Sequence, residues 1–182
     1  MSLPNRAEAH GDFIPDTSNQ RLLRNALGCF NTGVTIVTAA TSSGPAAITA
    51  NSFASVSLTP PLVLWSVDRS SARLDTFTHA QHFSIHILNA HQETLCMEVA
   101  RDPTRLQSMG LMDNEFGVPV LSDYLVRFDC SLEALHTAGD HVIIVGKVNV
   151  VSQSNCECEL ANPLAFYRGR TGSFTPNVDD TT

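Results

Sequence analysis

Residues 48–64 read ITANSFASVSLTPPLVL and are the most informative part of this chain. Five of its seventeen residues are serine or threonine and one is asparagine, whereas a strand buried on both faces is mostly apolar. Small hydroxyl and amide side chains let another molecule approach the backbone closely and offer it hydrogen bonds. The double proline at Pro60 and Pro61 then turns the chain into an apolar strand. This stretch therefore predicts a strand pair that also carries a binding surface.

Periodic patterns on both sides of this stretch predict a mainly β fold with a few short helices. Alternating apolar and polar side chains indicate strands, and apolar residues three or four positions apart indicate helices. The expected strands are residues 34–38, 62–67, 83–88, 126–136, 141–151 and 164–167, and the expected helices are residues 22–30, 71–80 and 91–107, the last broken near Pro103. Several strands joined by tight turns favour a closed antiparallel β-barrel with helical caps, because closure removes exposed strand edges.

The length and composition are typical of one globular domain. The chain has 182 residues, of which 43% are hydrophobic and 16% are charged, which is enough to bury a sizeable core. We expect residues 19–171 to form the domain, between a polar tail at residues 1–18 and a second tail at residues 172–182. The sequence contains no internal repeat and no linker long enough to divide it.

The net charge excludes two classes of partner, and the cysteine content indicates the compartment of the protein. Eleven basic against eighteen acidic residues give a net charge of −7, so neither nucleic acid nor an anionic membrane is an expected partner, because both require a basic surface. No apolar run is as long as a membrane span, and the N-terminus does not resemble a signal peptide. The five cysteines are odd in number and lack the spacing of a disulfide framework, which indicates reduced thiols in a cytoplasmic protein.

The hydroxyl-rich stretch and the strand after it predict a site for a planar cofactor that carries a phosphate, such as a flavin. A flavin ring requires hydrogen bonds at its edge and an apolar surface on which to stack. The residues expected at the ring and the ribityl chain are Thr49, Ala50, Asn51 and Ser52. The loop that opens the next helix offers backbone amides and a cationic side chain for the phosphate, through Ser66, Val67, Asp68, Arg69, Ser70 and Ser71. Each piece alone is equally explained as a strand end or a helix cap.

Two further segments are candidates for the same site. Gly139-Asp140-His141 lies between two expected strands, and His141 is placed to donate a hydrogen bond to a nicotinamide carboxamide and so to orient the ring. The alternative is a turn followed by a partly exposed strand histidine. Arg168 follows an aromatic pair near the end of the domain, where it either borders a cofactor pocket or is solvated while the aromatic pair closes the barrel.

Clusters of histidine and cysteine do not predict a metal site. His79, His82 and His86 have spacings of three and four residues, but the pattern changes from helix to strand near residue 83, so they do not share one face. Cys156 and Cys158 stand in a polar loop without a second cysteine pair. The other three cysteines, Cys29, Cys96 and Cys130, occupy apolar positions and are expected to be core thiols. A Gly-rich dinucleotide fingerprint is also absent.

Six segments of the chain resemble, in the same order, segments of the short-chain flavin reductase family, which supplies reduced flavin to monooxygenases. The segments are LRNALGCFNTGVT (residues 23–35), the stretch at residues 48–64, FSIHIL (83–88), GVPVL (117–121), GDH (139–141) and PLAFYRG (163–169). This resemblance implies a split-barrel fold, a homodimer, and the reduction of FMN or FAD by NADH or NADPH for a separate monooxygenase. It also implies flavin contacts at residues 49–52 and 66–71 and a nicotinamide contact at His141.

The chain departs from this family's pattern at a few positions. Ala47-Ile48 replaces a glycine followed by a large residue, Thr59 replaces an acidic residue, and Val99 replaces a phenylalanine expected beside the flavin. None of these changes removes a group that hydride transfer requires. Two alternatives remain open from the sequence: a flavin- or heme-binding protein of the same fold without turnover, and an interaction scaffold without a ligand. The sequence does not distinguish FMN from FAD or NADH from NADPH.

Overall fold

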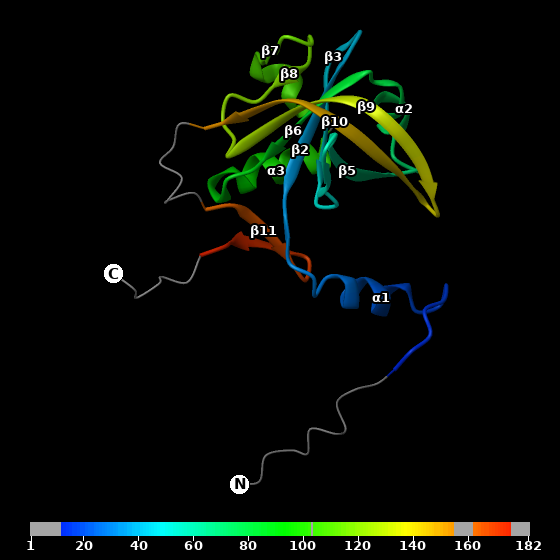
Figure 1. Cartoon of the computed structure of the whole chain (residues 1–182). Helices are drawn as coiled ribbons and strands as arrows, with labels where there is room; N and C mark the ends of the chain where they lie inside the picture. Colours follow the sequence, from blue (N-terminus) through cyan, green and yellow to red (C-terminus); the bar gives the residue numbers. More distant parts are fainter. Residues whose placement is uncertain (1–11, 103, 155–161, 176–182) are drawn as a thin grey trace.

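The computed structural model describes residues 12–102, 104–154 and 162–175, which form a mainly β protein with short helices (Figure 1). The strands are β1 (Thr32–Gly33), β2 (Thr35–Thr41), β3 (Gly44–Ala50), β4 (Ala54–Leu58), β5 (Pro61–Asp68), β6 (His82–Ile87), β7 (Met112–Asp113), β8 (Pro119–Val120), β9 (Val126–Ala138), β10 (His141–Gln153), β11 (Leu164–Tyr167) and β12 (Arg170–Ser173). The helices are α1 (Gln20–Leu27), α2 (Leu74–His79) and α3 (Glu93–Arg101), with 3-10 turns η2 (Ala90–Gln92) and η3 (Arg105–Met109). The predicted class is confirmed, and each expected strand has a counterpart.

The longest strands form one antiparallel sheet in the order β3-β2-β6-β9-β10-β5-β4. The hydroxyl-rich stretch supplies the end of β3, all of β4 and the start of β5, so it occupies both edges of the sheet. No backbone ladder joins β3 to β4 within the described ranges, and in this respect the pairing differs from the predicted closed barrel. The chain leaves the ladder at Asn51, and the curled sheet instead brings Ala50 of β3 and Trp65 of β5 into one core.

The main core lies inside the curled sheet and is covered at one end by α2. Trp65 is fully buried, and the rings of Phe77 from α2 and Phe83 from β6 meet it at centroid distances of 5.1 and 6.1 Å. Gly146 in β10 makes room for this packing, since a β-carbon there would lie 2.6 Å from the Phe83 ring. The register of β9 and β10 shifts between Val145 and Gly146. A bulge of this kind increases the local twist and helps the sheet to curl.

A second core cluster joins the outer side of β2 and β3 to α3 and to a small separate sheet. Ile36, Cys96, Val99 and Leu164 are all buried in this cluster. Val99, which replaces an expected phenylalanine, is therefore a core residue. The small sheet has the order β1-β11-β12, and its last strand ends at Ser173, inside the segment predicted to be a tail.

Helix α1 differs from the other helices because its apolar side chains are not packed within the chain. None of its residues is buried, and Leu27 and the adjacent Phe30 are 65% and 77% exposed. Figure 1 shows α1 below the main sheet, next to the hairpin of β11 and β12. The nearby Cys29 is also exposed, so its prediction as a core thiol was wrong, whereas Cys96 and Cys130 are buried as expected. No helix in the described ranges is long and apolar enough to cross a membrane.

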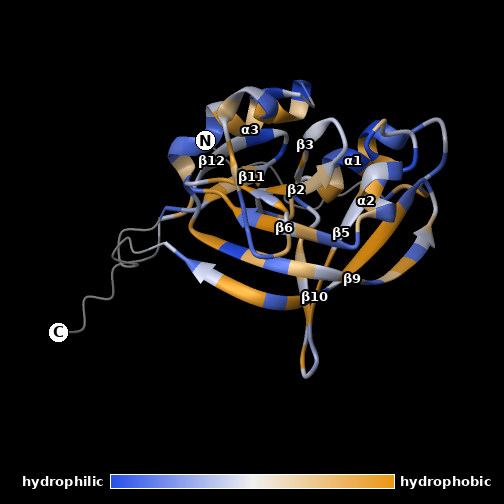
Figure 2. Cartoon of the chain, turned by 90° about the horizontal axis from the view of Figure 1, so that it is seen from above, coloured by the Kyte–Doolittle hydropathy of each residue, from blue (hydrophilic) through white to orange (hydrophobic). Residues whose placement is uncertain are grey.

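Strands β9 and β10 extend beyond the other strands as a long hairpin (Figure 1). Figure 2 shows that both strands carry hydrophobic stretches interrupted by polar bands. Two of these polar bands are important here. One belongs to a buried cluster around Asp129, and the other lies at the hairpin turn, beside the end of β5.

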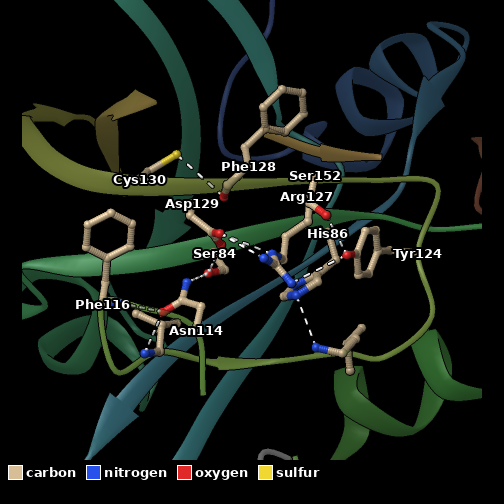
Figure 3. Close-up of polar contacts among 12 residues, drawn as sticks. Ser84, His86, Asn114, Phe116, Tyr124, Arg127, Phe128, Asp129, Cys130 and Ser152 are labelled. Carbon is tan, nitrogen blue, oxygen red and sulfur yellow. Dashed lines mark hydrogen bonds and ion pairs between the residues drawn. The ribbon is translucent and has the colours of Figure 1, made fainter. Parts of the chain in front are cut away.

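The buried cluster is centred on an ion pair between two residues of β9 (Figure 3). Arg127 Nη2 lies 3.0 Å from Asp129 Oδ2, and the two side chains are only 15% and 2% exposed. The Ser84 hydroxyl donates to Asp129 Oδ1 at 2.6 Å and accepts a hydrogen bond from the Asn114 amide at 3.2 Å. Because Asn114 in turn accepts from the backbone N–H of Phe116 and Val118, the cluster anchors the loop that follows β7.

Candidate functional site

The first predicted site segment, residues 49–52, is only partly available to a ligand. The Thr49 hydroxyl donates to the Cys96 carbonyl oxygen at 3.0 Å. Ala50 is buried, and its carbonyl oxygen accepts a hydrogen bond from the Thr35 hydroxyl at 2.8 Å. These two residues therefore hold β3 against α3 and β2. The exposed residues of the segment are Asn51 and Ser52.

Asn51 and Ser52 connect the end of β3 to two different parts of the molecule. The Asn51 amide has no hydrogen-bond partner among the described residues, and it lines a cavity of about 180 Å³ together with Met97 and Ala100 of α3 and Phe166 of β11. Ser52 Oγ accepts the backbone N–H of Ser66 at 2.9 Å. The sequence placed Ser52 at the cofactor, whereas its hydroxyl fixes the loop to β5, in continuation of the register that pairs β4 with β5.

The second predicted segment, residues 66–71, forms a compact loop around one carboxylate. Asp68 Oδ1 accepts hydrogen bonds from the Ser70 backbone N–H and hydroxyl, both at 2.7 Å, and the Asp68 carbonyl oxygen accepts the Ser71 N–H. The hydrogen bonds from Ser70 hold the pKa of Asp68 below its usual range, and the charge of the nearby His141 acts in the same direction. Asp68 is therefore an anion at neutral pH.

This geometry corrects three details of the predicted phosphate site. The amides of Ser70 and Ser71 are already engaged by Asp68, so they do not face outward. Helix α2 begins only at Leu74, after this loop. Val67 is buried in the main core, so its side chain does not face a ligand. The cation of the segment is Arg69, which lines a cavity of about 500 Å³ with Asp68, Ser70 and Asp140.

The turn between β9 and β10 lies directly beside this loop, as the site prediction requires. His141 is opposite Asp68 in the antiparallel ladder of β10 and β5. The Arg69 backbone N–H donates to the Asp140 carbonyl oxygen at 2.9 Å, and its guanidinium reaches the Gly139 carbonyl oxygen at 3.5 Å. Gly139 has a φ of 64°, a conformation that glycine adopts without strain. The fold thus brings two segments about seventy residues apart into one site.

His141 itself has one engaged and one free nitrogen. Its Nδ1 lies 2.7 Å from Asp140 Oδ1, and its side chain is 43% exposed. No described residue contacts its Nε2 by a hydrogen bond. The imidazole is therefore both oriented by the protein and accessible to a ligand.

The strand register gives this site an apolar floor that was not recognised in the sequence. Side chains directly opposite in an antiparallel ladder share a face, and every second residue of a strand points the same way. Ser66 is opposite Ile143 and Leu64 is opposite Val145, on the same face as Asp68 and His141. These apolar side chains are half-buried rather than in the core. The alternation of β5 contained the signal, but only the pairing with β10 shows which residues complete the surface.

Arg168 is not part of this constellation within the chain. Its backbone N–H donates to the Gly28 carbonyl oxygen at 2.8 Å, and its Nε lies 3.3 Å from Cys29 Sγ. It lines a different cavity, of about 460 Å³, between α1 and β11. Cys156 and Cys158 lie outside the described residues.

The described part of the chain contains no group of three or more histidine, cysteine, aspartate or glutamate side chains that is suited to a metal ion. The three closely spaced histidines diverge. His79 Nδ1 contacts the Asp75 carbonyl oxygen, His82 stacks on Phe116, and His86 is buried.

The residues of the site fit a flavin and a nicotinamide. A stacked ring requires an apolar surface with polar groups at its border. The face of β5 and β10 offers Leu64, Ile143 and Val145 as the surface and His141 at its polar end. Asn51 adds a side-chain amide without a partner among the described residues, on the loop that Ser52 fixes to β5.

Comparisons with known proteins agree with this geometry. The model of the flavin reductase like domain matches residues 27–175, so the chain belongs to this family. It is 47% identical over 163 residues to the FMN reductase (NADH) of Agrobacterium fabrum, covering 90% of this chain and 91% of that protein. It is 33% identical over 168 residues to the reductase subunit of a flavin-dependent monooxygenase from Rhodococcus jostii, covering 92% and 84%.

Solved structures show the same fold. The NADH:FAD oxidoreductase of Streptomyces globisporus, determined in complex with NAD and FAD fragments, superposes with a TM-score of 0.81 and 32% identity over 92% of this chain and 100% of that chain. The flavin reductase component of a bacterial tryptophan halogenase has a TM-score of 0.77 and 32% identity over 87% and 100%. The predicted family and enzyme class are thus confirmed, and the chain is a flavin reductase.

Proposed function

We propose that this flavin reductase oxidises NADH, reduces FMN or FAD on the outward face of β5 and β10, and releases reduced flavin to a separate monooxygenase. The observation that carries this proposal is the continuous surface from Ser52 through Ser66 and Asp68 to His141. It joins the two predicted flavin segments to the predicted nicotinamide contact. The relatives from Agrobacterium and Rhodococcus, named for FMN, NADH and a monooxygenase, support the same choice of substrates and partner.

The chain's own residues bind and orient in this mechanism. The reaction moves a hydride from the reduced nicotinamide to the flavin, and it requires the two rings to be stacked at short range. The apolar floor supports the stacked rings, Asn51 contacts the flavin, and His141 orients the carboxamide of the nicotinamide. Arg69 is the cation available to a phosphate. No general base is required.

NADH is the proposed hydride donor because a relative from Agrobacterium fabrum and one from Rhodococcus are named for NADH. The extra phosphate of NADPH is carried by the adenosine ribose, at the opposite end of the dinucleotide from the nicotinamide. The charges beside His141 therefore do not select between the two donors.

A turnover experiment tests the proposed function. The purified protein is mixed with NADH or NADPH, each with and without FMN or FAD, and the loss of nicotinamide absorbance is followed. We expect loss that depends on added flavin and is faster with NADH. A folded protein that binds flavin but oxidises neither nucleotide would instead support the non-catalytic alternative.

We propose that the chain works as a homodimer and that α1 packs against the second copy. The support is the apolar stripe of α1, where Leu22, Leu27 and Phe30 are all at least half exposed, although burial of such side chains contributes about 1.5 to 3 kcal/mol each. Light scattering of the parent should give twice the mass of the chain. A Leu27→Asp and Phe30→Asp double variant should give the monomer mass, with Leu135→Asp, an exposed residue of β9, as the matched control.

The closed form of the split barrel also belongs to this proposal, as does a domain that begins at residue 19 and ends at Ser173, where β12 ends. The core shared by β3 and β5 supports closure by side-chain packing, since no ladder joins β3 to β4 within the described ranges. A cytoplasmic location follows from the proposed use of NADH, and the free thiols of Cys96 and Cys130 are compatible with it.

A further inference from the structure

The position of Asp140 beside the proposed nicotinamide contact carries a further inference, which rests on the proposed function. Asp140 Oδ1 lies 2.7 Å from His141 Nδ1. An ionised carboxylate only accepts hydrogen bonds, so Nδ1 must carry the hydrogen atom. A neutral imidazole has a single N–H, and Nε2 is then a bare acceptor. The carboxylate therefore selects one of the two tautomers of His141.

The backbone holds this pair in place from the neighbouring strand. The Asp140 carbonyl oxygen accepts the Arg69 N–H at 2.9 Å, and His141 is paired with Asp68 in the ladder. Asp140 thus stands between a glycine turn and the first residue of β10. These contacts fix the backbone of both residues, and the turn presents the Asp140 carboxylate to His141 Nδ1 although that carboxylate is 90% exposed.

We propose that Asp140 is a positioning residue that keeps His141 in the Nδ1–H tautomer, so that Nε2 accepts a hydrogen bond from the carboxamide N–H of the reduced nicotinamide. This reverses the direction expected from the sequence, in which His141 donates. A ring protonated on both nitrogens donates from Nε2 to the carboxamide oxygen instead. The neutral and protonated forms of His141 therefore prefer opposite ends of the same carboxamide.

Other charged and titratable groups lie around His141, so any effect of pH on the test must take them into account. Asp68 faces it from β5, and Arg69 reaches the same turn from the loop after β5. His136 of β9 is opposite Ile143, two residues from His141 along β10 and on the same face. The pH dependence must therefore be compared between variants that differ at Asp140 alone.

The tautomer can be observed directly, without flavin or nicotinamide. Long-range ¹H–¹⁵N NMR spectra separate the two neutral tautomers of a histidine, and a His141→Gln variant assigns the signal. We expect the Nδ1–H form in the parent above the titration of the ring. In Asp140→Ala we expect a mixture shifted towards the Nε2–H form. A parent signal of the Nε2–H form would overturn the proposal.

A change of hydride donor tests the consequence for recognition. Reduced 3-acetylpyridine adenine dinucleotide has an acetyl group where NADH has the carboxamide, so it accepts hydrogen bonds but offers no N–H. At a pH where His141 is neutral, Asp140→Ala should raise the KM for NADH about tenfold, the value of one hydrogen bond, while the KM for the analogue stays unchanged or falls. Asp140→Asn, whose amide oxygen still accepts a hydrogen bond, should restore part of the preference.

A matched control is available elsewhere in the chain. His91 and Asp123 form another exposed pair, with Nε2 and Oδ2 2.6 Å apart, so Asp123→Ala removes the same charge from a similar contact. It should leave both KM values unchanged. Equal effects of Asp140→Ala on both donors, or no effect on either, would overturn the role of Asp140. A parent protein without flavin-dependent NADH oxidation would instead contradict the proposed function itself.

Discussion

Two histidines, one in β6 and one in β10, show how the same side chain serves structure in one place and ligand binding in another. His86 is fully buried, and both ring nitrogens meet the backbone: Nδ1 contacts the Ile36 carbonyl oxygen at 3.0 Å, and Nε2 accepts the Leu121 N–H at 3.1 Å. His141 is 43% exposed and keeps Nε2 free. An unused nitrogen at an accessible position, rather than the residue type, therefore marks the candidate site.

Burial also gives the two histidines different electrostatic surroundings. Removal from water lowers the pKa of His86 to about 4, and this effect outweighs the hydrogen bond to Ile36. Around His86, the buried ion pair of Arg127 and Asp129 completes a set of polar groups with hydrogen-bond partners inside the protein (Figure 3). Around His141, the neighbouring Asp68 and Asp140 are exposed, so water and ligands can reach the charges.

The largest effect should come from breaking the buried cluster. Asp129→Ala leaves Arg127 without its carboxylate and Ser84 without its acceptor, and loss of one partner of a buried ion pair costs about 3 to 5 kcal/mol. We expect the free energy of unfolding, measured by urea denaturation at pH 7, to fall by this amount. Asp123→Ala at the exposed His91 pair should change it by less than about 1 kcal/mol. Equal losses in the two variants would contradict the contrast between buried and exposed pairs.

The stability of the protein should fall as the pH decreases from about 6.5 to about 4. Unfolded His86 takes up a proton near 6.5, whereas the folded ring resists protonation until about 4, so the stabilising contribution is complete above the first value and decreases below it. At about 1.4 kcal/mol for each pH unit, the loss amounts to about 3 kcal/mol.

Urea denaturation at several pH values measures this slope. The His86→Gln variant should show a flatter dependence between pH 6.5 and 4.5 than the parent, because glutamine does not titrate there. Identical slopes in the parent and in His86→Gln would mean that His86 does not govern acid stability.

Removal of the accessible histidine should affect turnover but not stability. His141→Ala loses the contact to the nicotinamide, and we expect kcat/KM for NADH to fall about tenfold, the equivalent of one hydrogen bond. The free energy of unfolding in urea should stay within about 0.5 kcal/mol of the parent's value, as for other surface substitutions. Steady-state kinetics at saturating flavin measures the first quantity, and a loss of stability without a loss of turnover would reverse the assigned roles.

The smallest effect should come from the hydrogen bond that fixes the loop after β3 to β5. Ser52→Ala removes the acceptor of the Ser66 N–H, an exposed hydrogen bond worth about 1 kcal/mol. We expect a decrease of this size in the free energy of unfolding and a weaker affinity for flavin, measured by fluorescence titration. Ser55→Ala in β4 is the control, since no described hydrogen bond involves its hydroxyl. An unchanged flavin affinity in Ser52→Ala would mean that the loop does not need this link.

Most of the secondary structure and two of the site segments were predictable because their signals are local. Alternation along 126–136 and 141–151, with a glycine between them, is enough to predict the hairpin that carries His141. Other features depended on distant residues. Val67 was predicted to contact the cofactor, but the strand register points its side chain into the core. Ser52 was also predicted to contact the cofactor, but its hydroxyl accepts the backbone N–H of Ser66. Cys29 was predicted inside, yet α1 leaves it exposed.

The mainly β class, the family resemblance and the segments that meet at the site can be read from the sequence alone, because periodicity, turns and motifs depend on neighbouring residues. Which of these side chains are free depends on the folded structure. The pairing of β5 with β10 places Asp68 beside His141, and the Arg69 N–H holds the turn at Asp140 from a segment far earlier in the chain. A side chain becomes available to a ligand only when the folded chain leaves its polar atoms unpaired and accessible, and that outcome depends on contacts between residues far apart in sequence.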